Sequence, residues 1–265
     1  MIRKKIGLCL GGGSSLGFAH VGVIKALIEN NIPFDIITGT SMGAVVGGAY
    51  ALFQDINVVE EKALDFNRGQ IMDFRLFPLS SNALFAGKKA DAFYKDAYGE
   101  DTKIEGLKMP FGAVAVDIAS GQLEYMTSGK LWEAVRASTA VPGVFSPYEI
   151  GDKRLVDGGI VENVPVDIAK KMGAEFIIAV DVINYAAVKI KSDKMIGILL
   201  NSFQVAQVAL SQMKVEKADI VIRPDLSGHS MIDFKKENTQ KVIEKGYLKT
   251  IEMIPQIKKL LGLKD

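Results

Sequence analysis

Cysteine, histidine and long apolar runs are all scarce in this chain of 265 residues, and each scarcity argues against a class of function. The single cysteine, Cys9, has no partner for an internal disulfide and argues against a metal cluster, which suits a reducing compartment. No apolar run approaches the roughly 18 residues of a transmembrane helix. The N-terminal segment MIRKK at residues 1–5, charged at 3–5, precedes an apolar stretch too short for a secretion signal. The sequence therefore predicts a soluble, unprocessed cytoplasmic protein.

An excess of charge of either sign is also absent, with 32 basic and 31 acidic side chains. Because no dense basic stripe is present, we expect no nucleic-acid partner. The sequence has no repeats, low-complexity tracts or linker, and its length is enough to bury one large core. We therefore expect a single domain over residues 1–265, and assembly into a homo-oligomer stays open.

Apolar runs at 6–10 and 36–38 have the character of buried strands, and residues 18–30 between them show helical spacing. A helix of small residues follows the second run. Strands that alternate with helices in this way predict a right-handed βαβ unit and a parallel sheet. The sequence further predicts paired strands at 111–117 and 123–126, a helix at 131–138, a hairpin of 148–150 and 154–156, a strand at 176–182, a helix at 195–215, a strand at 220–222 and a helix at 237–261 with a break near Pro255.

The most informative stretch is GTSMG at residues 39–43, which places a serine between a predicted strand and a predicted helix. This context is typical of a nucleophile elbow, whose strained turn presents the serine hydroxyl above the sheet. The N-terminus of the following helix directs its dipole and free N–H groups at the reacting atom. Ser41 is therefore the predicted nucleophile of an acyl hydrolase.

A glycine-rich loop, GGGSSLG at residues 11–17, lies between the first strand and the first helix. Its backbone N–H groups are the predicted oxyanion hole, because glycine permits the backbone angles that bring several donors together. The same loop allows a second interpretation as a nucleotide-binding turn. Leu16 occupies the position of the last glycine in that motif, although Tyr185 and Lys189 form a pair used by some nucleotide-dependent dehydrogenases. A dehydrogenase is thus the weaker alternative.

Two schemes provide a base for Ser41. The chain order Ser41, Asp157, His229 matches the triad of α/β-hydrolases, but only one strand and one helix precede the elbow here. The other histidine, His20, follows the glycine loop and has a structural or loop-positioning role. In the second scheme Asp157, at a strand end before two glycines, acts directly, because desolvation raises the pKa of a carboxyl group.

Residues 67–89 crowd apolar side chains together without a clear period. One interpretation is a mobile flap over the site, since long irregular loops in compact domains often act as lids. Leu76, Phe77, Leu84 and Phe85 are then the candidates that line an acyl channel. The alternative is a loop-rich part of the core.

Five blocks together resemble the patatin-like phospholipase family, and their order and spacing match its bacterial members. The blocks are residues 11–17, 18–23, 39–44, 136–145 and 157–159. Each is short, but their joint occurrence is specific, and they span about the first two-thirds of the chain. The last third matches only in general character.

This resemblance implies a three-layer α/β/α fold with a mostly parallel central sheet. It implies a dyad of Ser41 and Asp157 without histidine, which hydrolyses lipid acyl esters through an acyl-serine intermediate, with no metal and no cofactor. It also implies that residues 137–145 shape a wall near the site. The oxyanion donors that it implies are the backbone groups of Gly12, Gly13 and Ser14.

Two departures from the family pattern bear on the substrate. Ser14 stands where the family has its third glycine, and Leu16 stands where the family has a basic residue. Without that positive charge, a neutral ester or a lysolipid is expected at least as much as a phospholipid. A weakly active or inactive scaffold or regulatory protein is the alternative function.

The C-terminal helix permits peripheral contact with a membrane surface, because its apolar positions alternate with lysines. Packing against the core is the alternative explanation of the same pattern. The residues concerned are Ile251, Ile254, Ile257, Leu260 and Leu261, with Lys258, Lys259 and Lys264.

Overall fold

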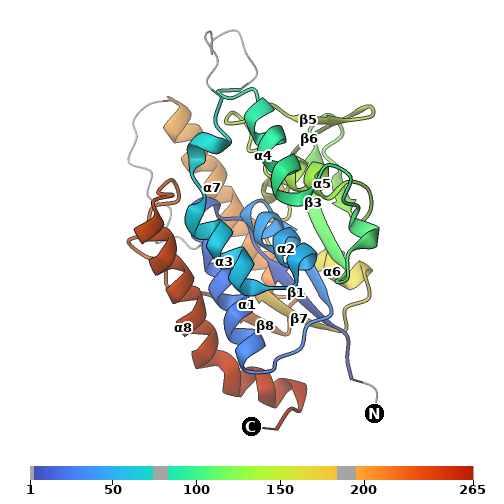
Figure 1. Cartoon of the computed structure of the whole chain (residues 1–265), viewed down its shortest axis with the longest axis vertical. Helices are drawn as coiled ribbons and strands as arrows, with labels where there is room; N and C mark the ends of the chain where they lie inside the picture. The colour runs from blue at the N-terminus through green and yellow to red at the C-terminus, as the bar shows by residue number, and fades with distance from the viewer. Residues whose placement is uncertain (1–2, 74–82, 184–194, 265) are drawn as a thin grey trace.

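The computed structural model describes residues 3–73, 83–183 and 195–264. A mixed sheet forms its centre, with the strand order β5-β6-β3-β2-β1-β7-β8 and β4 paired to β3 (Figure 1). The strands are β1 (Ile6–Leu10), β2 (Ile36–Thr40), β3 (Phe111–Asp117), β4 (Leu123–Met126), β5 (Tyr148–Ile150), β6 (Lys153–Asp157), β7 (Phe176–Val180) and β8 (Ile220–Ile222). The predicted strands are all present.

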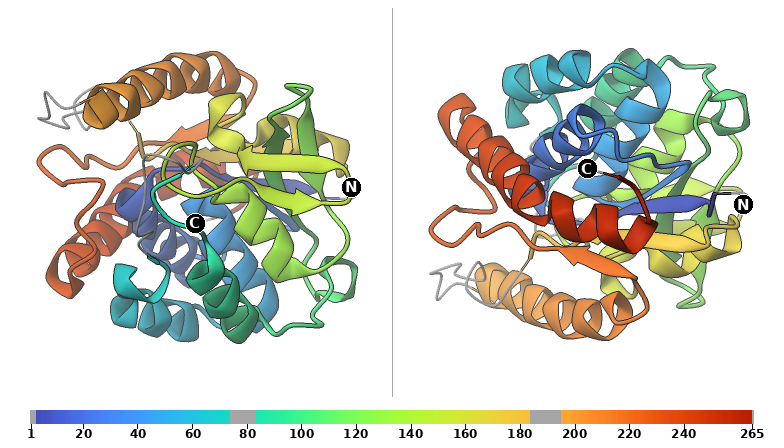
Figure 2. Two further views of the ribbon diagram at one scale, coloured as in Figure 1. Left: turned by 90° about the horizontal axis from the view of Figure 1, so that it is seen from above. Right: turned by 90° about the horizontal axis from the view of Figure 1, so that it is seen from below.

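Helices cover both faces of this sheet, which gives the three layers of the predicted α/β fold (Figure 2). The helices α6 and α7 lie on one face, and the others pack on the opposite face. Their bounds are α1 (Ala19–Glu29), α2 (Met42–Phe53), α3 (Ile56–Asp65), α4 (Lys88–Tyr98), α5 (Leu131–Ser138), α6 (Val166–Lys171), α7 (Met195–Val215) and α8 (Lys236–Leu261). Short 3₁₀ turns lie at Ser14–Phe18, Arg68–Gln70, Ile104–Gly106 and Gly158–Ile160.

The centre of the sheet is buried on both faces. Every residue of β1, β2, β3 and β7 is buried, and the pairs β1–β2, β1–β7, β2–β3 and β7–β8 are parallel. This explains why these strands appear in the sequence as continuous apolar runs rather than as alternating patterns. The antiparallel strands β4, β5 and β6 lie toward the other side of the sheet.

The strand register explains how distant segments meet. On one edge of β3, the parallel strand β2 ends with Thr40 opposite Val114. On the same edge, the antiparallel strand β6 ends with Asp157 opposite Ala115, while β4 covers the other edge. The two strands run toward each other along this edge of β3, so their C-terminal ends meet. Ser41, which follows Thr40, therefore lies next to Asp157.

One prediction about the C-terminal helix is wrong, because α8 continues through Pro255 to Leu261. The helix changes direction near its end without breaking (Figure 1). Pro255 is exposed, so water can bind the backbone carbonyl that loses its helical partner there, while Ile254 and Ile257 stay buried and keep the helix in place. No helix within the described ranges is both long and apolar enough to cross a membrane.

Candidate active site

The turn after β2 holds Ser41 in a strained backbone conformation, with φ 53° and ψ −122°. A non-glycine residue here costs about 1–3 kcal/mol, so the surroundings must fix it. The Ser41 N–H donates to the Ser138 hydroxyl at 2.9 Å, and that hydroxyl donates to the Val114 carbonyl at 2.7 Å. A side chain at Gly39 would collide with the backbone of α2, and one at Gly43 with β1. These contacts form the sharp turn that the glycine–serine pattern predicts.

The carboxylate of Asp157 is the polar group that faces Ser41. It is 1% exposed, lies beside the Ser41 side chain, whose hydroxyl stabilises its charged form, and accepts a hydrogen bond from the Gly159 N–H at 2.8 Å. Burial raises the pKa of Asp157 to about 6, although the Ser41 hydroxyl and the Gly159 N–H oppose this effect. A carboxylate with this pKa is ionised at neutral pH and accepts a proton more readily than an ordinary aspartate.

The glycine loop lies directly against the elbow, because a Cβ at Gly12 would be 3.1 Å from the Ser41 Cβ. Asn163 binds Gly12 on both sides: its carbonyl accepts from the Gly12 N–H at 3.1 Å, and its Nδ2 donates to the Gly12 carbonyl at 3.3 Å. The Gly12 N–H is thus already engaged, contrary to its predicted role as an oxyanion donor.

The next two N–H groups of the loop, those of Gly13 and Ser14, donate to no protein acceptor within the described part of the chain. Both residues line the cavity beside Ser41. Ser14 has φ 51°, a left-handed conformation that glycine adopts most easily. The serine therefore keeps the backbone shape that a glycine would give at this position.

A cavity of about 710 Å³ opens at Ser41 and Asp157. Most of its lining is apolar and comes from α2, α3, α4 and a group of packed aromatic rings, although charged residues of α3 and α4 also reach it. The rings are Phe18, Phe66, Phe93 and Phe234, with centroids 5.5–6.2 Å apart in neighbouring pairs. A space of this size and character accommodates a long apolar group next to the serine.

The residues predicted to line an acyl channel are not among the cavity-lining residues that the structure describes. Leu76 and Phe77 lie outside the described residues, whereas Leu84 and Phe85 are described and do not line the cavity. The Phe85 N–H donates to the Val144 carbonyl at 2.9 Å, and its ring packs on Phe145 with centroids 5.7 Å apart. Phe145 lines the cavity, so Phe85 supports the wall from behind instead of forming it.

Neither histidine forms a hydrogen bond with Ser41 or Asp157. His229 pairs through Nδ1 with the Asn238 side chain at 2.7 Å. His20 is fully buried and its Nε2 donates to the Gly11 carbonyl at 2.7 Å, so it contacts the glycine loop. Burial lowers the pKa of His20 to about 4, which keeps the ring neutral. The arrangement agrees with a pair of serine and aspartate rather than a triad.

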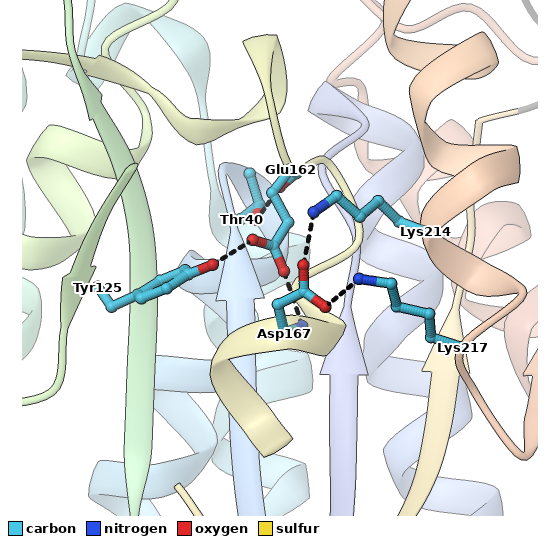
Figure 3. A network of polar contacts seen from close by, with 6 residues as sticks. All are labelled: Thr40, Tyr125, Glu162, Asp167, Lys214 and Lys217. Atoms are coloured by element: carbon cyan, nitrogen blue, oxygen red, sulfur yellow. Dashed lines mark hydrogen bonds and ion pairs between the residues drawn. The ribbon is translucent and has the colours of Figure 1, made fainter. Parts of the chain in front are cut away.

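A polar network ties the elbow to α6 and α7 (Figure 3). Its members are Thr40, Tyr125, Glu162, Asp167, Lys214 and Lys217. The Thr40 hydroxyl donates to the Glu162 carbonyl at 3.0 Å, and the Glu162 carboxylate accepts from the Tyr125 hydroxyl and the Asp167 N–H, each at 2.8 Å. Lys214 and Lys217 both bind the Asp167 carboxylate. The network fixes the start of α6, and with it the segment that follows Asp157.

An α/β protein with a serine on a strand–helix elbow, a buried carboxylate and a glycine loop has the layout of an acyl hydrolase. The chain belongs to the patatin-like phospholipase family, whose family model matches residues 8–170.

Relatives agree with this assignment, and a solved structure shares the fold. The patatin-like phospholipase domain-containing protein ZK370.4 of Caenorhabditis elegans is 40% identical over 182 residues, which cover 67% of this chain and 13% of the relative. Neuropathy target esterase sws of Drosophila melanogaster is 35% identical over 189 residues, which cover 68% of this chain and 13% of the relative. Lysophospholipase nte1 of Emericella nidulans is 38% identical over 182 residues, which cover 68% of this chain and 12% of the relative. The chain thus spans about an eighth of the length of these relatives. VipD from Legionella pneumophila shares the fold, with a TM-score of 0.61 and 14% identity over 96% of this chain and 67% of that one.

Proposed function

We propose that the protein hydrolyses lipid acyl esters, with Ser41 as nucleophile and Asp157 as base. The observation that carries the proposal is the Ser41 side chain beside the buried Asp157 carboxylate, at the edge of a mostly apolar cavity. Membership of the patatin-like phospholipase family supports it, and two of the relatives are named as an esterase and a lysophospholipase.

In the first half-reaction, Asp157 takes the hydroxyl proton while the Ser41 oxygen forms a bond to the ester carbonyl carbon. The carbonyl oxygen becomes negative and accepts hydrogen bonds from the N–H groups of Gly13 and Ser14. Such donors lower the barrier by roughly 2.7–4 kcal/mol each in known enzymes. The bond to the alcohol oxygen then breaks, and Asp157 returns its proton to the departing alcohol.

In the second half-reaction, a water molecule gives a proton to Asp157 and its oxygen attacks the acyl-serine carbonyl. The bond to Ser41 breaks, the fatty acid is released, and the serine oxygen regains the proton from Asp157. One ester and one water thus become one acid and one alcohol, and the protein ends in its starting state.

The substrate that we propose is a phospholipid, a lysophospholipid or a neutral ester, with its acyl chain against the apolar wall. Leu16 is fully buried and brings no positive charge to the loop, so a neutral ester fits at least as well as an anionic lipid. Ile232 lines the cavity and is 59% exposed, so it lies where the cavity opens to solvent. We place any peripheral membrane contact at this opening rather than on α8. Cytoplasmic location and homo-oligomer formation stay predictions.

Labelling with a fluorophosphonate probe tests the proposal, because the probe reacts only with an activated serine. We expect the wild-type chain to be labelled at Ser41 and Ser41→Ala to lose both the label and the turnover of nitrophenyl esters. Ser128→Ala is the matched control, because Ser128 is exposed and lies far along the chain from the elbow. A folded wild-type protein that neither reacts nor cleaves an ester would favour the scaffold alternative.

A further inference from the structure

The cavity lining includes polar side chains, and α7 contributes two of them to one wall. Gln204 and Gln207 lie about one turn apart on α7, and both line the cavity. They are nearly buried, with 8% and 6% of their surface exposed. This helix lies beyond residues 8–170, so the family match does not account for it.

Gln207 places this wall next to the reacting groups. Its Nε2 donates to Asn163 Oδ1 at 3.4 Å, and Asn163 in turn binds Gly12. A Cβ at Gly159, the residue whose N–H binds Asp157, would collide with the Gln207 amide. The α7 wall therefore begins within contact distance of the Asp157 turn, on a helix that Lys214 anchors to Asp167, with Lys217 binding the same carboxylate just beyond the helix end.

Gln204 differs from Gln207 because its side-chain oxygen is unpaired. The Oε1 atom is buried and has no hydrogen-bond partner among the described residues. A buried acceptor without a donor is costly, and such an atom in a native structure calls for an explanation. Gln204 lines the cavity, so a rotation of its amide would turn Oε1 toward a ligand there, which can supply the missing donor.

We propose that Gln204 accepts a hydrogen bond from a free hydroxyl on the alcohol part of the ester. This inference rests on the proposed function. With the acyl chain against the aromatic wall and the carbonyl at Ser41, the alcohol part faces α7. A hydroxyl supplies the donor that Oε1 needs, whereas an ether, ester or phosphate oxygen offers only another acceptor. The preferred substrates are therefore polyol esters that keep a hydroxyl free near the scissile bond.

Two esters with the same acyl chain test this subsite. One is a 1-monoacylglycerol, and the other carries methyl ethers in place of both free hydroxyls. The ratio of their kcat/KM values is measured for the wild-type chain, for Gln204→Met, and for Gln212→Met as an exposed control on the same helix. Loss of one neutral hydrogen bond lowers the preference by about 3- to 10-fold, so we expect that fall in Gln204→Met and no change in Gln212→Met.

The ratio is taken within one preparation, so a partly unfolded variant does not distort it. An unchanged ratio in Gln204→Met, with both esters cleaved by the wild type, overturns the subsite and leaves the proposed function standing. A wild-type chain that cleaves neither ester overturns the proposed function and the subsite together. An equal fall for Gln212→Met also contradicts the inference, since the effect would then belong to the helix as a whole.

Discussion

At the scale of single residues, Asp157 meets two opposing demands. Its carboxyl group is buried almost completely, which favours the neutral form, but a base for Ser41 must be charged. The Ser41 hydroxyl and the Gly159 N–H stabilise the charged form only in part, so the pKa stays at about 6. The same burial that strengthens the base therefore works against its ionisation, and both effects are measurable.

The first consequence is a pH–rate profile. Only the ionised carboxylate can accept the Ser41 proton, so kcat/KM should rise about tenfold for each pH unit below 6 and level off above it. Initial rates on a neutral ester from pH 4.5 to 8.5 give the profile. A profile that keeps rising up to pH 8, or one unaffected between pH 5 and 7, would speak against Asp157 as the base.

The second consequence concerns stability. The folded pKa of about 6 lies above the unfolded value near 3.8, so the native state binds more protons between these values. The contribution of Asp157 is therefore fully present below about pH 4 and is lost as the pH rises through 6. Asparagine carries no charge at any pH, so Asp157→Asn removes the cost of a buried charge. The variant should be more stable than the wild type at pH 7.5 by at most about 3 kcal/mol and should lack activity.

Thermal unfolding at several pH values checks this expectation. The melting temperatures of wild type and Asp157→Asn should converge toward pH 4 and separate by about 5 °C at pH 7.5. Asp152→Asn is the control, because Asp152 is exposed in the neighbouring hairpin turn. A gap that is constant with pH would show that the gain has another cause.

His20 is the other residue whose burial has a measurable consequence. Its ring holds the Gly11 carbonyl at the start of the loop whose Gly13 and Ser14 N–H groups we assign to the oxyanion. We expect His20→Ala to lower kcat by about 10- to 100-fold with little change in KM, because a shift of about 1 Å in such a loop suffices. His20→Gln, which can still donate to Gly11, should recover part of the loss. Equal losses in both variants, or a change in KM alone, would contradict this positioning role.

At the scale of elements, the sequence predicts the sheet well and the cavity poorly. Buried parallel strands are continuous apolar runs, and GTSMG at 39–43 marks the elbow, whereas the pairing of Ser41 with Asp157 is implied only by the family resemblance. The helices α3, α4 and α6 were not predicted. In α4 the apolar residues are interleaved with charges and small residues, and α6 is only six residues long. The sequence therefore predicts an acyl wall at Leu76, Phe77, Leu84 and Phe85, whereas residues of α3 and α4 line the cavity.

Several supporting residues of the site were also beyond prediction. Each of them binds a group that is distant in sequence. Ser138 accepts from the Ser41 N–H, Asn163 donates to the Gly12 carbonyl, and Gln207 donates to the Asn163 side chain. Serine, asparagine and glutamine are common, and a single one carries no spacing signal. Ser138 at least lay within the block 136–145 that the family resemblance marked.

At the scale of the whole molecule, α8 closes the core through α1. The two helices meet at glycines, because a Cβ at Gly22 would collide with the Ile243 carbonyl and one at Gly246 with the Ala19 carbonyl. The residue after Ala19 is His20, so the contact with α8 also steadies the helix that positions the glycine loop. Of the apolar residues considered for membrane contact, Ile254 and Ile257 are buried.

Gly246→Ala tests whether α8 is part of this core. Because backbone atoms stand where the new methyl group would lie, the two helices must separate, and overpacking of this kind costs about 1–3 kcal/mol. Urea unfolding should show this loss of stability, and thermal unfolding should show a melting temperature lower by about 2–6 °C. If residues 1–265 form a single domain, the chain unfolds in one transition. Gly106→Ala is the matched control, since nothing lies within 4 Å of the added Cβ and its φ is not positive. A helix that leaves α1 for a membrane surface would tolerate the methyl group. Equal stability of the two variants would therefore show that α8 is not part of the core, and would favour the interfacial role that its lysines suggest.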